Sequence, residues 1–485
     1  MTAPSVSHAE PEAPSPGRWI AMASLLLAGF MNLIDITIVN VAIPSLQDAF
    51  DATDSQIEWV VAAYIMAFAL CLIPAGRLGD VVGRRRMFVA GVAVFGLGSL
   101  LCGMAPSIGA LVAARVLQGI GGAMIGPQTL ALVPVLFPPR ERGLAFALFG
   151  LSAGLASVTG PVLGGWLISL DLWGLGWRPI FLVNVPVGLL TIFAALRFVP
   201  SVPGDRSLRL DFVGIALAGL ALLLILFPLI EGRQFGWPWW CFALIAAAVP
   251  VVLAFALWQR YRARIGAAQL LPVALFRYRS YVIGLAITML IFGGIPGFFL
   301  VLAFMLQVGN GLTPLESGLT TLPFSVGVLL ASVASGVMGL RWPRKRIMAG
   351  CLLLAGGMVL LRTVLPMGGE ALVRAALFLP LIISGLGLGT AISPLFQTIL
   401  SNVEDGDAGA ASGALQAFQQ VGGALGLAVM GEVFFSHLGR NLPGAEEPVA
   451  VYSTAMQLAI IPGVAGFICE AFLVWRLPRP ERGPR

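Results

Sequence analysis

Long apolar runs alternate with short polar segments along nearly the whole chain. Because about 20 apolar residues in a helix cross the hydrocarbon core of a bilayer, each run predicts one transmembrane helix. A transmembrane barrel would instead show short segments of alternating polarity, which these continuous runs do not resemble. The fourteen predicted spans lie near residues 19–43, 56–76, 87–105, 108–136, 143–168, 178–197, 211–230, 238–258, 280–306, 317–339, 347–365, 372–399, 408–436 and 452–475.

Composition supports the same class. Of the 485 residues, 58% are hydrophobic and only 11% are charged, whereas a soluble domain carries roughly 25% charged residues. A soluble enzyme, a disordered chain and a coiled coil are excluded, and an all-α polytopic membrane protein is expected. The net charge of +6 does not indicate nucleic-acid binding, because the basic residues lie in short loops between apolar runs.

The basic residues also orient the predicted helices. The two tails and the loops on their side of the membrane hold 23 of the 29 basic residues, and the opposite loops hold five. Because cytoplasmic loops carry the excess of arginine and lysine, both termini are expected to be cytoplasmic. The expected location is the plasma membrane, as in a bacterial inner membrane. The remaining basic residue, Arg115, lies inside a predicted span.

A glycine- and arginine-rich loop occurs twice, at residues 76–86 and 336–346, an offset of 260. The offset equates spans two and three with spans ten and eleven, unless the match is a coincidence of membrane loops. Two parallel six-helix bundles with a pseudo-two-fold relation are then expected, with spans seven and eight inserted between them. The expected units are a disordered tail (1–17), an N-terminal bundle (18–198), a linker with the two inserted helices (199–279), a C-terminal bundle (280–476) and a second tail (477–485).

The chain offers little cofactor chemistry. Its five cysteines all lie in apolar runs, and its two histidines belong to no cluster with metal-ligand spacing. The single lysine, Lys345, follows no glycine-rich loop, so a Walker motif is missing. We therefore expect no metal, no cofactor and no enzymatic activity, which leaves an ion gradient as the energy source for any active transport.

Four segments stand in order along the chain: Asp35 and its neighbours, the loop 76–86, the stretch 111–122 around Arg115, and the stretch 160–165. They resemble the first-helix motif, motif A, motif B and the antiporter motif C of the major facilitator superfamily. The resemblance is specifically to its 14-helix drug:proton antiporter branch (drug:H+ antiporter family 2), and segments 177–186 and 408–426 are further similar. The resemblance implies export by alternating access, driven by a proton gradient.

Asp35 lies inside an otherwise apolar run, where a carboxylate costs about 2.5–3.5 kcal/mol and is functional by default. Arg115 is its natural partner, because both residues lie at a similar depth below the outer ends of their spans, and the resemblance implies that the two helices are adjacent. We expect the pair to couple proton exchange to transport. A purely structural ion pair that holds two helices together is the alternative.

A substrate pocket is expected on the helix faces beside this pair, because amides, methionine and small residues form adaptable apolar sites. Ordinary helix packing is the alternative for each residue. The candidates are Met31, Asn32, Val39, Leu111, Gln118, Gly119 and Gly122.

In the loop 76–86, Asp80 and Arg84 can form a charged latch whose breaking would favour reorientation of the halves. The resemblance implies that this loop acts as a gate. Its glycines permit a tight turn, and the alternative is that its arginines only set topology. The gate candidates are Gly76, Asp80, Gly83, Arg84 and Arg85.

Glycine and proline in the fifth span let a neighbouring backbone come close and kink the helix. In the family this pattern is associated with antiport, and close packing without directional meaning is the alternative. The residues concerned are Gly160, Pro161, Gly164 and Gly165. Elsewhere, Glu432 and Glu470 lie toward the ends of their spans, where we expect them to reach the membrane surface.

Together these features predict a proton-coupled exporter of small amphipathic compounds, working as a monomer in the lipid bilayer. Ile295 and Ala375 occupy the positions equated with Asp35 and Arg115, so the second half has no matching pair. Some members of the drug:proton antiporter branch that take dicationic drugs carry a further acid within the tenth span, and this chain has none between Glu316 and Arg341. The resemblance therefore implies monocationic or neutral substrates. A transporter of the same fold dedicated to one metabolite, or an uptake symporter, is the alternative; a non-transporting scaffold is a third possibility, and it leaves Asp35 unexplained.

Overall fold

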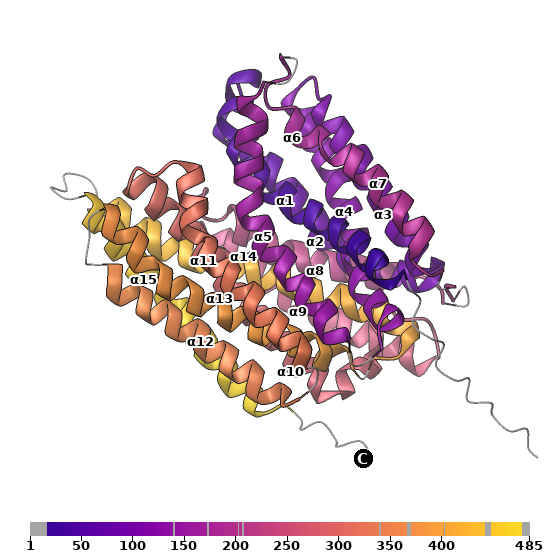
Figure 1. The fold of residues 1–485 in the computed structure, drawn as a ribbon. Helices are drawn as coiled ribbons and strands as arrows, with labels where there is room; N and C mark the ends of the chain where they lie inside the picture. Colours follow the sequence, from indigo (N-terminus) through magenta and orange to yellow (C-terminus); the bar gives the residue numbers. More distant parts are fainter. Residues whose placement is uncertain are drawn as a thin grey trace, which may run out of the picture.

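The computed structural model describes residues 17–138, 141–171, 174–201, 203–205, 208–338, 341–365, 370–401, 403–441 and 448–477. Both predicted tails lie outside the described residues, except for Gly17 and Leu477. The regular structure of the described residues is helical throughout (Figure 1). The expectation of an all-helical membrane protein is confirmed.

Fourteen long helical segments coincide with the fourteen predicted spans. Thirteen of them are long and apolar enough to cross a membrane, and α5, in which some side chains lie outside the described set, matches the fifth span. The helices are α1 (Arg18–Phe50), α2 (Asp54–Val82), α3 (Arg84–Gly103), α4 (Ile108–Leu136), α5 (Arg142–Ser169), α6 (Pro179–Leu182) with α7 (Asn184–Phe198), α8 (Phe212–Glu231), α9 (Trp239–Arg264), α10 (Arg279–Phe304), α11 (Pro314–Met338), α12 (Pro343–Val364), α13 (Glu370–Leu400), α14 (Ala408–Asn441) and α15 (Pro448–Trp475).

Two differences from the predicted spans have local causes. The sixth span is interrupted at Val183, where α6 ends and α7 begins. Pro186 lacks the N–H that would bond to the carbonyl of Leu182, so a continuous helix would lack one backbone hydrogen bond at this point. In addition, α1 continues to Phe50, seven residues beyond the predicted end at residue 43. The prediction stopped early because it followed the apolar run, and polar residues extend the helix beyond that run.

The two halves repeat one packing pattern. In the first half α1 packs on α5, α2 and α3 pack on α4, and α3 packs on α7. The corresponding pairs of the second half are α10 on α14, α11 and α12 on α13, and α12 on α15. Between the halves, α2 contacts α14 and α5 contacts α11, and exchanging the halves converts one of these pairs into the other. This is the expected pseudo-two-fold relation.

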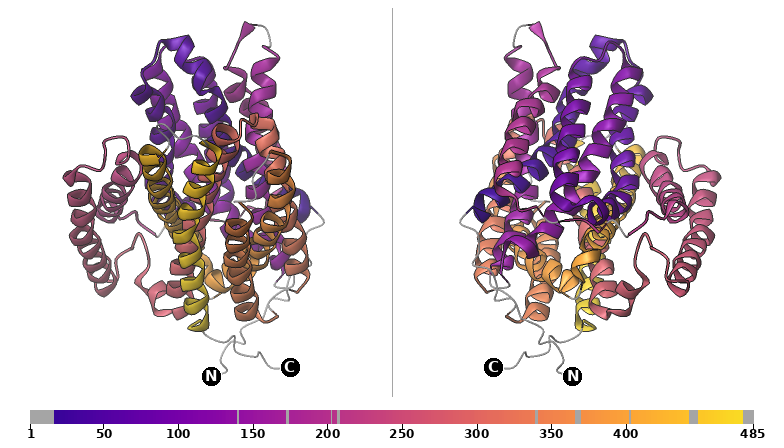
Figure 2. Two further views of the ribbon diagram at one scale, coloured as in Figure 1. Left: turned by 90° about the vertical axis from the view of Figure 1, so that its left-hand side faces the viewer. Right: turned by 90° about the vertical axis from the view of Figure 1, so that its right-hand side faces the viewer.

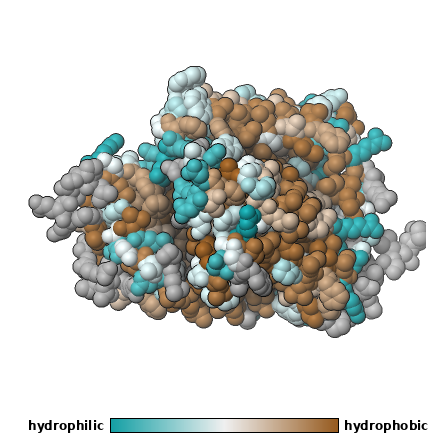
Figure 3. Space-filling view, turned by 90° about the horizontal axis from the view of Figure 1, so that it is seen from above, coloured by the Kyte–Doolittle hydropathy of each residue, from teal (hydrophilic) through white to brown (hydrophobic). Residues whose placement is uncertain are grey.

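The inserted helices stand beside this body (Figure 2). Helix α8 packs against α2 of the first half and α14 of the second, whereas α9 packs mainly on α8. Much of α9 is exposed and apolar, including Leu253 and Leu257, which are 58% and 64% exposed. Apolar residues also cover most of the face seen from above, with hydrophilic residues in separate patches (Figure 3). The exposed apolar side of α9 suits contact with lipid.

Glycines bring the halves together at one end of the molecule, which we call the basic end: the end at which α1 begins, α2 ends and α3 begins. The prediction of a loop at residues 76–86 is wrong, because residues 76–82 belong to α2 and residues 84–86 to α3, and only Gly83 lies between the two helices. A Cβ at Gly76 of α2 would lie 2.2 Å from the carbonyl oxygen of Gly409 in α14. At the equivalent position, a Cβ at Gly336 of α11 would lie 2.8 Å from the Cα of Leu144 in α5. Both contacts between the halves therefore depend on glycine at equivalent positions.

Candidate functional site

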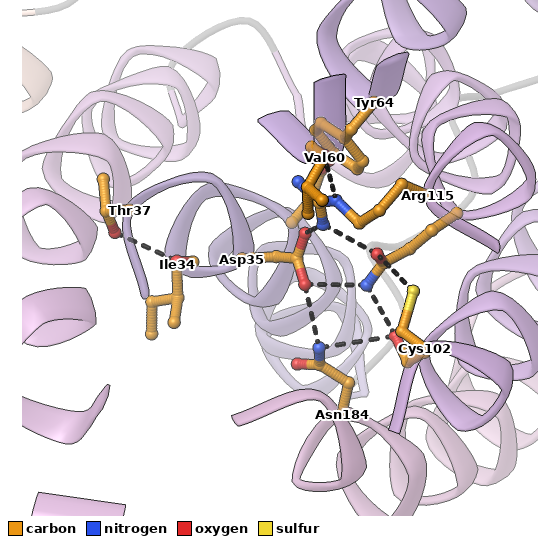
Figure 4. Close-up of polar contacts among 11 residues, drawn as sticks. Ile34, Asp35, Thr37, Val60, Tyr64, Cys102, Arg115 and Asn184 are labelled. Carbon is orange, nitrogen blue, oxygen red and sulfur yellow. Dashed lines mark hydrogen bonds and ion pairs between the residues drawn. The ribbon is translucent and has the colours of Figure 1, made fainter. Parts of the chain in front are cut away.

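The structure brings Asp35 of α1 and Arg115 of α4 into a direct ion pair between Oδ2 and Nη1 (Figure 4). Both side chains are 0% exposed. The pair lies where five helices converge: α1, α2, α4 and α7 each supply a polar side chain or carbonyl to it, and Ser99 of α3 contacts the two amides that bind Asp35. An unpaired charge would be strongly destabilising at this depth, so the two charges stabilise one another.

Helix α2 holds the guanidinium in place. Arg115 donates from Nε to the carbonyl oxygen of Val60 at 3.0 Å, and its Cζ lies 4.2 Å from the centre of the Tyr64 ring. The Tyr64 hydroxyl donates to Asn32 of α1. Arginine suits this site because its planar head can stack on an aromatic ring while it donates in its own plane. The Nη2 atom has no hydrogen-bond partner among the described residues, so it is available to an acceptor.

Two amides complete the environment of Asp35. Gln118 donates from Nε2 to Oδ1 at 2.7 Å and accepts from Arg115 Nη1 at 2.7 Å. Asn184 of α7 donates to the same Oδ1 at 3.2 Å. Both amides also lie within hydrogen-bonding distance of the Ser99 hydroxyl on α3, at 2.7 and 3.4 Å. The carboxylate is thus an acceptor for one charged and two neutral donors inside a protein core.

Four members of this site were not among the sequence candidates: Tyr64, Ser99, Cys102 and Asn184. The Cys102 thiol contributes by donating to Gln118 Oε1 at 3.7 Å. The signal for Ser99 and Asn184 was weak, because single small polar residues are common in apolar helices. Asn184 does lie in the segment 177–186, which is similar to the drug:proton antiporter branch. Of the four residues, it is the one that this similarity could have identified as a candidate.

The predicted pocket residues take different places. Gln118 and Asn32 join the polar network, whereas Val39 and Leu111 are 0% exposed within one packed apolar cluster, and Met31 lies in another. Both glycines serve close helix contacts. A Cβ at Gly119 would lie 2.5 Å from the Tyr64 carbonyl oxygen, and one at Gly122 would lie 3.0 Å from Asn32 Oδ1.

The gate candidates gather at the basic end, where Asp80 reaches across to the second half. Its Oδ1 accepts the backbone N–H of Gly409 at 2.9 Å and its Oδ2 accepts that of Ala410 at 3.0 Å, so it caps the start of α14. Arg84 Nη2 lies 3.6 Å from Asp80 Oδ1, which is the expected latch contact. A carboxylate at a helix N-terminus is favourable because it faces unpaired N–H groups and the positive end of the dipole.

Two further arginines and a glycine lie beside the gate candidates. Arg77 forms an ion pair with Asp407 at 2.8 Å, a second charged contact between the halves. Arg85 donates to the carbonyl oxygen of Val199 at 3.1 Å. Gly83 has φ of 106°, a conformation that other residues adopt only with strain, and it joins α2 directly to α3.

The glycines of α5 permit contact with α1 near Asp35. A Cβ at Gly160 would lie 1.9 Å from the hydroxyl oxygen of Thr37, and one at Gly164 would lie 2.8 Å from Ile38 Cγ1. Gly165 is looser, with its nearest atom at 4.0 Å. The distances at Gly160 and Gly164 show the expected close approach of α5 to α1. The helix runs without a break through residues 160–165, and the side chain of Pro161 lies outside the described residues.

Comparison with known proteins agrees with this architecture. The family model described as Major Facilitator Superfamily matches residues 25–427. The chain is 39% identical over 429 residues to a probable actinorhodin transporter of Streptomyces coelicolor, covering 88% of this chain and 74% of that protein. It is 33% identical over 492 residues to a puromycin resistance protein of Streptomyces alboniger, covering 98% and 94%.

The fold is also that of a solved transporter. The structure of the proton:xylose symporter XylE superimposes with a TM-score of 0.64 over 96% of this chain and 97% of that one, at 14% identity. The repeated helix packing, the motif order and the family match over most of the chain agree. The chain belongs to the Major Facilitator Superfamily, among the multi-pass membrane transporters related to drug and antibiotic efflux proteins.

Proposed function

We propose that the protein is a proton-coupled exporter of small amphipathic compounds, monocationic or neutral, that works by alternating access as a monomer. The observation that carries this proposal is the fully buried pair of Asp35 and Arg115. It lies in the first half only, because Ile295 and Ala375 stand at the equated positions in the second. Membrane-embedded ionisable residues of this kind mark ion and substrate pathways.

In the proposed cycle a proton binds to a carboxylate oxygen of Asp35 and removes its charge. The Coulombic attraction to Arg115 is then lost, and the guanidinium keeps its contacts with Val60 and Tyr64. Gln118 hydrogen-bonds both partners, so its amide reorients when the pair breaks. Because α1, α4 and α7 all meet at this carboxylate, its protonation changes how three helices pack, and no cofactor other than the proton gradient is required.

The gate supports the alternating-access part of the proposal. We place the two bundles at residues 18–198 and 280–476, joined by the linker 199–279. The protein lies in the plasma membrane, and its basic end faces the cytoplasm. Asp80 and Arg77 then join the bundles on the cytoplasmic side. Releasing both contacts would allow the halves to separate there and expose the site to the cytoplasm.

Relatives support the export direction and the substrate class. Besides the two named above, the chain is 33% identical to a tetracenomycin C resistance and export protein of Streptomyces glaucescens, covering 92% of this chain and 83% of that protein. Amphipathic compounds would suit the site around Asp35, whose polar groups are amides, hydroxyls and one ion pair. A carrier of the same fold dedicated to a single metabolite is the second candidate.

The direct test uses purified protein in proteoliposomes. An imposed proton gradient is expected to drive uphill movement of ethidium, a fluorescent monocation, and of a neutral aromatic antibiotic. Collapsing the gradient with nigericin is expected to stop both. Movement that continues unchanged without a gradient would contradict proton coupling, and movement of a single compound from a broad panel would favour the dedicated carrier.

A further inference from the structure

Another acidic residue lies deep in the protein, in the half that lacks the ion pair. Glu470 is on α15, five residues before the helix ends at Trp475, and it is 0% exposed. The prediction that its side chain reaches the membrane surface is therefore wrong. It belongs to the buried face of α15, between Phe467 and Val474, which are also 0% exposed, so its side chain points into the bundle and not toward lipid or water.

The carboxyl group of Glu470 lacks the partners that stabilise a charge. Neither oxygen forms a hydrogen bond of normal geometry with the described residues. The helices packed against α15 are α10, α12 and α14. Among their described titratable residues, only the Cys351 thiol of α12 comes near enough to interact with the carboxyl group. Asp35 at the other buried site has an arginine and two amide donors. An ionised carboxylate with no donor in an apolar core is strongly unfavourable.

We propose that Glu470 is a second proton-binding site, which holds a proton in this conformation. The inference that this proton exchanges during transport rests on the proposed function. Release gives a carboxylate and a proton that passes to water at the basic end, and it requires α15 to move relative to α12 so that water or a cation reaches the oxygens.

The structure offers a suitable cation for the released state. Arg344, at the start of α12, donates to the carbonyl oxygen of Trp475 at the end of α15. Five residues of helix separate Trp475 from Glu470, a rise of about 7.5 Å. A slide of α15 along α12 toward the basic end would therefore bring the carboxyl group closer to this guanidinium. Packed helices commonly move in this way during domain closure.

Infrared spectroscopy of the reconstituted full chain at pH 8 tests the proton directly. Solvent-exposed carboxylates are ionised at that pH, so the carbonyl stretch of a protonated carboxylic acid reports buried acids alone. We expect Glu470→Gln to lose a band that persists in Asp35→Asn and in the control Glu432→Gln. Glu432 is half-buried and accepts a hydrogen bond from the Trp237 indole at 2.9 Å, so it serves as the matched partnered acid.

A spectrum in which Glu470→Gln removes no such band would overturn the proposal. Cys351→Ala provides the second variant: it leaves Glu470 intact and is expected to shift the same band without removing it. If Glu470→Gln does not fold, a band that is unaffected by Cys351→Ala overturns the assignment equally.

The exchange of the proton is tested by counting. The number of protons moved per ethidium, measured with a pH-sensitive dye inside proteoliposomes, is expected to be lower in Glu470→Gln than in wild type. An unchanged ratio would overturn the role in transport. If the wild type moves no ethidium with a proton gradient, the proposed function fails, whereas the infrared result still decides whether Glu470 carries a proton.

Discussion

Asp80, which lies near the end of α2, caps the start of α14 by accepting the backbone N–H of Gly409 at 2.9 Å. The two residues are 329 positions apart in the chain and belong to opposite halves of the molecule. The carboxylate side chain is fully buried, and Arg84 lies 3.6 Å from it. One acidic residue thus connects a sequence motif of the first half to a helix dipole of the second.

Removing this cap is expected to loosen the basic end. Asp80→Ala leaves two N–H groups of α14 without an acceptor, and the loss of a side-chain N-cap costs about 0.5–2 kcal/mol. A cysteine introduced at the fully buried Ser412 of α14 should then react faster with a maleimide applied from the basic end. The control is Asp48→Asn, at an exposed position of α1. Equal reactivity in Asp80→Ala and the control would show that this carboxylate does not hold the halves together.

Gly76→Ala is expected to separate the halves by a steric route. Its Cβ would lie 2.2 Å from the Gly409 carbonyl oxygen, and such overpacking costs about 1–3 kcal/mol. Gly96→Ala in α3 is the matched control, because no atom lies within 4 Å of its added Cβ. Thermal unfolding in detergent should show a lower melting temperature for Gly76→Ala alone. Equal melting temperatures would contradict the close contact of α2 and α14.

Gly160 and Gly165 provide a matched pair on one helix. Gly160→Ala would place its Cβ 1.9 Å from the Thr37 hydroxyl oxygen, whereas the nearest atom at Gly165 is 4.0 Å away. We expect Gly160→Ala to lower stability and transport, and Gly165→Ala to leave both near wild type. Adding Thr37→Ala should partly restore Gly160→Ala, because it removes the clashing oxygen. Failure of that rescue would place the effect elsewhere on α5.

Arg115 is expected to tolerate a lysine better than an alanine. Arg115→Ala leaves Asp35 buried without its cation, and breaking a buried pair in this way costs about 3–5 kcal/mol. Arg115→Lys retains the charge but loses the contacts made in the guanidinium plane. Drug efflux assayed in cells should be lost in the first variant and partial in the second. Wild-type efflux in both variants would argue against any role for the ion pair.

The sequence predicted features that extend over about 20 residues, but not those that depend on one or a few residues. Apolar runs of about 20 residues predicted the spans because a bilayer imposes that length on every helix. The break at Val183 and the extension of α1 to Phe50 escaped this criterion, since the first depends on one proline and the second on polar residues beyond the lipid.

The site residues that could be predicted were those whose charge carries a high free-energy cost inside an apolar span. Asp35 and Arg115 stand out because charge is rare and expensive in an apolar run. Ser99 and Asn184 did not, because small polar residues are inexpensive there. The reach of Asp80 to Gly409 and the full burial of Glu470 depend on how helices far apart in the chain pack, and no local pattern contains that information.

Proton coupling through Asp35 is the central claim, and Asp35→Asn tests it most directly. The amide keeps the size of the side chain but cannot exchange a proton, so the variant is expected to insert and fold while ethidium transport driven by a proton gradient in proteoliposomes is abolished. Asp48→Asn, with the same change at an exposed position, should transport as the wild type does. Undiminished gradient-driven transport by Asp35→Asn would contradict the account.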